Sequence, residues 1–168
     1  MDDLELTRSP DDRRLYVLDG VGTLRLEGWA SRRATAAAGA DGWRFTRRGF
    51  WQRAIEATDA AGTTVGSFEP RTVRRGGDMW WDGRELMLRP ASMWRERYAL
   101  ADRDRDRELV ILDGKSWGRR PVKVSVEDPG AIEPGLLLFA AFVVRSLAED
   151  AASAAGAGAA ASAAAVSS

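Results

Sequence analysis

The chain has 168 residues, and its 25 Lys and Arg residues are balanced by 25 Asp and Glu residues. This length suits one domain with a sizeable core, and the charge balance argues against a general nucleic-acid binder. The sequence has no cysteine and no histidine, which excludes disulfides, zinc–thiolate sites, cysteine nucleophiles, palmitoyl anchors and histidine-based catalysis.

The first residues, MDDLELTRSPDD, are acidic and lack the apolar region of a signal peptide. We therefore interpret residues 1–13 as an N-terminal arm that precedes the folded domain. A cytoplasmic protein, which can be peripheral to a membrane, is expected.

Short strands separated by turns are expected from residue 14 to residue 126. In LYVLDGVGTLRLEG, two alternating apolar runs flank residues 19–22, a pattern typical of a β-hairpin. Further turns are expected at residues 59–62, at residues 82–83 and in the charged segment between RYALAD and ELVILDG. About twelve such strands indicate a mainly β fold, either a sandwich or a barrel. Residues 31–42, SRRATAAAGADG, are expected to form an exposed loop.

The segment after residue 133, PGLLLFAAFVVRSLAED, has few β-branched residues and predicts a helix over residues 134–150. Its apolar run ends after nine residues, whereas a membrane span needs roughly 18–20. A short helix that is apolar on every side is usually buried in protein. The lumen of a barrel of about twelve strands is close to the width of a helix, so we predict that this helix fills the barrel. The residues expected to form this core are Leu136, Leu137, Phe139, Phe142 and Val143.

The segment WRFTRRGFWQRAIEATDAAGTTVGSFEP, followed by RELMLRPASMWRERYALAD and a terminal GLLLFAAFVV, resembles the LURP-one-related and phospholipid-scramblase-like families. The resemblance covers roughly residues 14–150. It implies the tubby C-terminal-like fold, which is a twelve-stranded barrel around a hydrophobic C-terminal helix. It also implies a peripheral, lipid-linked role without catalysis. The low-complexity Ala, Gly and Ser residues at 151–168 are expected to be a disordered tail.

Arginine pairs are candidates for holding a phospholipid headgroup, because guanidinium groups bind phosphate through two hydrogen bonds. Adjacent Trp80 and Trp81 must point to opposite faces of a strand, so one of them is expected to be partly exposed. An exposed tryptophan beside arginines suits a lipid interface. The alternative is that the arginines are outward residues paired with nearby acids and that the tryptophans are core. The predicted headgroup ligands are Arg47, Arg48, Arg74, Arg75, Arg119 and Arg120, and the predicted interface aromatics are Trp80, Trp81 and Trp117.

Asp102, Asp104 and Asp106 are weak candidates for a calcium site, because they have the spacing of the first ligands of an EF-hand loop. The loop glycine is replaced by Arg107 and the flanks read as strands, so a solvated hairpin tip is the preferred interpretation. No metal site and no cofactor are predicted. No nucleotide-binding motif or catalytic set stands out either, and we expect the protein not to be an enzyme.

The sequence therefore predicts a module that binds anionic phospholipid or a membrane surface, without nucleic acid and without a transmembrane span. The alternative is a soluble barrel that takes a small molecule at its mouth, or a protein-interaction module. The oligomeric state is left open.

Overall fold

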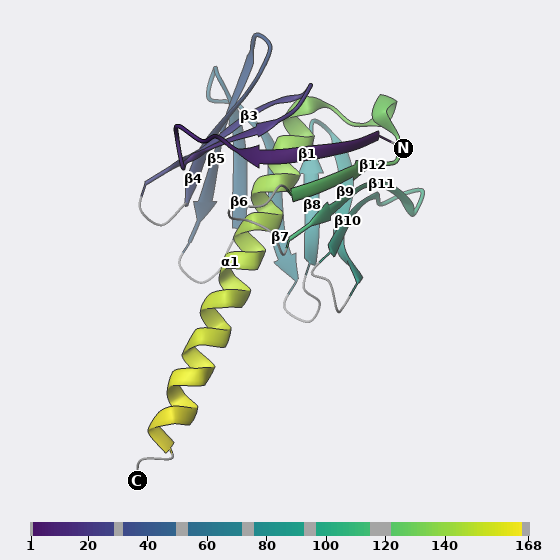
Figure 1. The fold of residues 1–168 in the computed structure, drawn as a ribbon. Helices are drawn as coiled ribbons and strands as arrows, with labels where there is room; N and C mark the ends of the chain where they lie inside the picture. The colour runs from purple at the N-terminus through teal and green to yellow at the C-terminus, as the bar shows by residue number, and fades with distance from the viewer. Residues whose placement is uncertain are drawn as a thin grey trace.

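A computed structural model describes residues 2–28, 32–49, 54–71, 76–92, 97–114 and 122–165, the last ten of these by their backbone alone. Twelve antiparallel strands form a closed barrel in which each strand pairs with its neighbours in sequence, and β1 pairs with β12 to close it. A helix passes through the barrel and leaves it at one end (Figure 1). The strands are β1 (Asp2–Arg8), β2 (Leu15–Leu18), β3 (Gly22–Glu27), β4 (Arg33–Ala38), β5 (Asp41–Arg48), β6 (Ala54–Asp59), β7 (Thr64–Arg71), β8 (Gly76–Trp81), β9 (Arg84–Ser92), β10 (Arg97–Asp102), β11 (Arg107–Asp113) and β12 (Val122–Val126).

The helix α1 (Pro134–Ala165) follows a short 3-10 turn, η1 (Pro129–Ala131), and supplies the core of the barrel. All nine residues from Leu136 to Val144 are at most 2 % exposed. Alternate residues of the strands point inward to meet them, as period-two patterning requires. The predicted barrel filled by a buried helix is therefore confirmed, and the five predicted core residues are among the buried ones: Leu136, Leu137, Phe139, Phe142 and Val143.

The predicted hairpins at residues 19–22, 59–62 and 82–83 are confirmed, as is the charged turn between β10 and β11. The prediction of an exposed loop at residues 31–42 is wrong, because this segment contains β4 and the start of β5. The inward residues of β4 are Ala34 and Ala36, both buried, and α1 packs more closely against β4 than against the other strands. The close approach of α1 to β4 requires small inward side chains. Because alanine is only weakly apolar, the alternation of apolar and polar residues that identifies a strand was not evident in the sequence of β4.

Two domain boundaries also differ from those predicted. Residues 2–8 are not an arm outside the domain, because they form β1, where Leu4 and Leu6 alternate with polar residues and β1 pairs with both β2 and β12. The helix does not end at residue 150 but continues to Ala165, so the prediction of a disordered tail at residues 151–168 is wrong for residues 151–165. Alanine is the best helix former, and it dominates this segment.

Candidate functional site

The two ends of the barrel are distinguished by where α1 begins and where it leaves. At the entry end, the start of α1 lies beside the β2–β3 turn. At the exit end, Arg145 of α1 contacts Tyr16 at the start of β2. Since neighbouring strands are antiparallel, the odd-numbered strands end at the exit end and the even-numbered strands begin there.

Arginines gather at the exit end on the side formed by β1 to β5. Arg14 lies beside the end of β3, because its carbonyl oxygen accepts a hydrogen bond of 2.8 Å from the Leu26 amide. Arg33 lies on the other side of this strand, directly opposite Glu27. Residues 8–14, 25–27, 32–33 and 47–48, which carry these arginines, contain three carboxylates, namely Asp11, Asp12 and Glu27. We call the arginines gathered on this side of the exit end the basic rim. Its members are Arg8, Arg13, Arg14, Arg25, Arg32, Arg33, Arg47 and Arg48.

Arg47, predicted as a headgroup ligand, instead binds the helix. One guanidinium nitrogen lies 2.9 and 2.8 Å from the two carboxylate oxygens of Asp150. Both side chains are largely buried, at 15 % and 20 % exposure. Arg47 therefore fastens β5 to α1 where the helix leaves the barrel.

Arg48, the second residue of this predicted pair, points to the opposite face of β5. Its Nε lies 2.6 Å from the Glu56 carboxylate across the strand pair. Its side chain is 69 % exposed, so the arginine itself remains accessible to solvent. The alternative interpretation, in which these arginines are outward residues paired with nearby acids, describes Arg48; Arg47 also pairs with an acid, but it is largely buried and its partner lies on the helix.

The other arginines of the basic rim form fewer ion pairs with described residues. Arg25 forms an ion pair of 3.0 Å with Asp12. No described residue forms an ion pair with Arg8, Arg13, Arg14 or Arg33. Arg13, Arg14 and Arg33 are also exposed. These four arginines of the basic rim thus carry positive charge that no ion pair with a described carboxylate offsets.

A second ionic contact lies on the helix at the exit end. Arg145 pairs with Glu149 one turn later, and its guanidinium carbon lies 5.5 Å from the centre of the Tyr16 ring. Burial raises the pKa of Glu149 above its ordinary value, and the neighbouring Arg145 and Arg47 only partly offset this effect. Buried carboxylates favour their neutral form for this reason.

Trp80 and Trp81 point to opposite faces of β8, as predicted. Trp80 is 37 % exposed, while Trp81 is 2 % exposed and lies inside the barrel. The Trp81 indole packs on Phe139 at a centroid distance of 5.5 Å, and its Nε1 donates a hydrogen bond of 3.1 Å to Glu133. The assignment of Trp81 to a membrane interface is therefore wrong, because the sequence did not show which ring faces the lumen.

The remaining predicted lipid ligands, Arg74, Arg75, Arg119 and Arg120, lie outside the described residues, as does Trp117.

The aspartates considered for calcium lie in the turn between β10 and β11. Asp106 pairs with Arg89 at 2.7 Å, and Asp102 lies 3.7 Å from Arg84. The Asp102 carboxylate also accepts a hydrogen bond of 3.2 Å from the Asp104 amide. Within the described part of the chain, no group of three or more acidic side chains is arranged to hold a metal ion. The preferred interpretation, a solvated hairpin tip, describes this turn.

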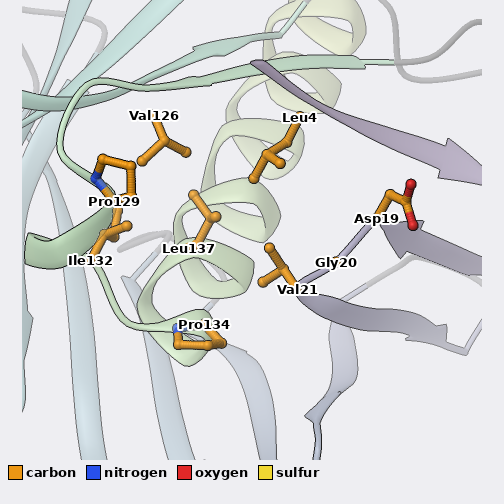
Figure 2. Close-up of a pocket in the computed structure, with 9 residues that line it drawn as sticks. All are labelled: Leu4, Asp19, Gly20, Val21, Val126, Pro129, Ile132, Pro134 and Leu137. Carbon is orange, nitrogen blue, oxygen red and sulfur yellow. The ribbon is translucent and has the colours of Figure 1, made fainter. Parts of the chain in front are cut away.

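The entry end differs from the exit end in charge and in shape. Its hairpin turns carry Asp19, Asp59 and Asp82, while the aspartates of the β10–β11 turn alternate with Arg103 and Arg105. An open cleft of about 390 Å³ lies there between β1, the β2–β3 turn, the end of β12 and the start of α1 (Figure 2). Its lining residues are Leu4, Asp19, Gly20, Val21, Val126, Pro129, Ile132, Pro134 and Leu137.

Sequence reasoning missed the basic rim as a set, and although its alternative places a small molecule at the mouth of the barrel, it named no residue of this cleft. The repeated Arg-Arg dipeptides were a signal for the rim, but only strand pairing shows that Arg14 and Arg33 flank the same strand. The cleft is lined by residues from three separate parts of the sequence, namely Leu4, residues 19–21 and residues 126–137, and no local pattern connects the three.

Comparison of the chain with protein-family models, with curated proteins and with solved structures gave no match. Among the described residues, no helix combines the length and the apolar character needed to cross a membrane.

Proposed function

We propose that this protein is a non-catalytic module that binds the anionic surface of a membrane through the basic rim. The observation that carries the proposal is the group Arg8, Arg13, Arg14 and Arg33, which lies at one end of the barrel without ion-pair partners among the described residues. The resemblance to the LURP-one-related and scramblase-like families implies the same peripheral, lipid-linked role.

Guanidinium chemistry supports phosphate as the recognised group. Arginine donates paired hydrogen bonds in a planar geometry that fits two phosphate oxygens. Each basic residue close to an anionic membrane contributes about 1 kcal/mol. The four arginines together therefore supply about 4 kcal/mol at low salt, a weak and reversible attachment. Because these side chains are near the surface, salt is expected to screen much of this energy.

The helix α1 contributes to the structural support of the basic rim at the exit end. α1 leaves the barrel at the same end as the basic rim and is tied to β5 by the Arg47–Asp150 ion pair. Within the barrel frame, Arg8 and Arg33 lie on paired strands, and Arg13 and Arg14 lie in the connection between β1 and β2. Holding charged side chains on such a frame reduces the entropy lost on binding.

The proposal is tested by vesicle flotation of the full chain at low and at physiological salt. Vesicles of neutral lipid are compared with vesicles that contain phosphatidylserine or a phosphoinositide. We expect the chain to float only with anionic vesicles and to be released as salt increases.

Two charge-matched variants localise the binding. Arg13→Gln, Arg14→Gln and Arg33→Gln together remove three positive charges from the basic rim. Arg103→Gln, Arg105→Gln and Arg107→Gln remove three charges from the β10–β11 turn at the entry end. The rim variant is expected to lose binding by roughly two orders of magnitude, since about 3 kcal/mol is removed, while the entry-end variant binds as the wild type does.

A third variant replaces Arg74, Arg75, Arg119 and Arg120 with glutamine and tests the pairs predicted from the sequence. Equal loss in the rim and entry-end variants would show attraction by overall charge and would contradict a localised site. Absence of binding to any anionic vesicle at low salt would reject the membrane-surface function.

A further inference from the structure

The apolar cleft at the entry end lies at the opposite end of the barrel from the basic rim and plays no part in the proposed membrane contact. Figure 2 shows Leu4, Val21, Val126, Ile132 and Leu137 projecting around a common space, with Asp19 and Gly20 at its edge. The cleft has a volume of about 390 Å³. This volume falls in the range of sites that hold small organic ligands.

Several lining side chains retain apolar surface that the barrel does not cover. Leu4, Val21 and Ile132 are only half-buried, although each packs against the core. Burying the exposed part of such side chains under a ligand is favourable in proportion to the apolar area removed from water. The cleft therefore favours a ligand with an apolar body.

The negative charge at the edge of the cleft determines which ligands with an apolar body the cleft favours. Asp19 lines the cleft, and no described residue forms an ion pair with its carboxylate. Among the described residues that line the cleft, Asp19 is the only charged one. A cation is attracted to such an edge and an anion is repelled.

We propose that this cleft binds a small amphipathic amine, with its apolar body on Leu4, Val21 and Ile132 and its protonated nitrogen beside Asp19. The apolar contacts supply most of the affinity, because the carboxylate is exposed to water. The ion pair supplies the preference for an amine.

The test uses three probes with the same eight-carbon chain: octylammonium, octanol and octanoate. Each is titrated into the isotopically labelled full chain while backbone amide signals are followed by NMR. We expect saturable shifts at Gly20, Val21 and Ile132, with octylammonium binding about fivefold more tightly than octanol, as an exposed ion pair allows. Octanoate is expected to bind more weakly than octanol.

Two variants separate the apolar body from the charge. Val21→Trp fills the cleft and is expected to abolish saturable binding of all three probes, while thermal unfolding checks that the barrel remains folded. Asp19→Asn is expected to weaken octylammonium about fivefold and to leave octanol unchanged. Asp82→Asn makes the same substitution in another entry-end turn and is expected to have no effect.

Equal affinity for octylammonium and octanoate, or no effect of Asp19→Asn, would overturn the selectivity for amines. The absence of saturable shifts with every probe would overturn the site. Vesicle binding is expected to be unchanged in Val21→Trp and Asp19→Asn, so the cleft and the basic rim can each fail separately.

Discussion

Phe139 of α1 and Phe45 of β5 pack against each other inside the barrel in a tilted arrangement, with ring centroids 5.1 Å apart and planes inclined by 60°. Trp81 of β8 lies against Phe139 at 5.5 Å. The helix thus links two strands of the wall that do not pair with each other. Removing this contact should weaken the whole barrel and not only the helix.

Phe139→Ala is expected to lower the free energy of unfolding by about 3–5 kcal/mol, because it removes a buried ring and leaves a cavity. Urea denaturation followed by circular dichroism measures the loss. Phe139→Asp, which places a charge in the lumen, is expected to leave the protein insoluble or without a cooperative transition. Trp80→Ala, on the outer face of β8, is the control and should cost less than about 1 kcal/mol. A soluble, cooperatively folding Phe139→Asp variant would contradict a helix buried in the barrel.

Gly135 provides a test of how tightly the helix enters the barrel. A Cβ atom at this position would lie 2.7 Å from ring atoms of both Trp43 and Trp81. Gly135→Ala is therefore expected to destabilise the fold by about 1–3 kcal/mol, although alanine is the better helix former. At Gly130 the nearest atom would be 3.6 Å away, so Gly130→Ala should leave the thermal midpoint nearly unchanged. Equal thermal midpoints for Gly135→Ala and Gly130→Ala would show that the Trp43 and Trp81 rings can move aside without loss of stability.

Much of the fold could be predicted from the sequence, because the signals were local. Val122, Val124 and Val126 alternate on β12, and all three are buried. The uninterrupted apolar run from Leu136 required a surrounding shell, and the number of strands supplied one of the right size.

The errors arose where the deciding interaction lies far away in the sequence. Ala34 and Ala36 did not identify β4, because their small size matters only once α1 packs against them. The partner of Arg47 is Asp150, 103 positions away, and no spacing rule connects the two. The resemblance and the arginine pairs suggested a lipid-binding surface, but strand pairing was needed to group Arg14 with Arg33.

The Arg47–Asp150 ion pair should contribute more than the Arg48–Glu56 pair one residue away. Both side chains of the first pair are at most 20 % exposed, whereas Arg48 is 69 % exposed. A double-mutant cycle with Arg47→Gln and Asp150→Asn is expected to give a coupling energy of about 1 kcal/mol, and the matching cycle at Arg48 and Glu56 less than about 0.5 kcal/mol. Equal couplings would mean that partial burial at the exit end adds nothing to the ion pair.

Glu149 should make the stability of the barrel depend on pH. Burial raises its pKa in the folded protein above the ordinary value of 4.5, so the folded state holds the proton more tightly than the unfolded state. The stabilisation is fully present below the ordinary value and is lost as pH rises through the higher folded pKa. The free energy of unfolding of the wild type relative to Glu149→Gln is therefore expected to decrease as pH rises from below the ordinary value through the raised folded pKa, measured by urea denaturation. Glu69→Gln, at an exposed position on β7, corrects for the loss of one carboxylate. A relative stability that increases over this range would show that the attraction of Arg145 and Arg47 outweighs the burial of Glu149.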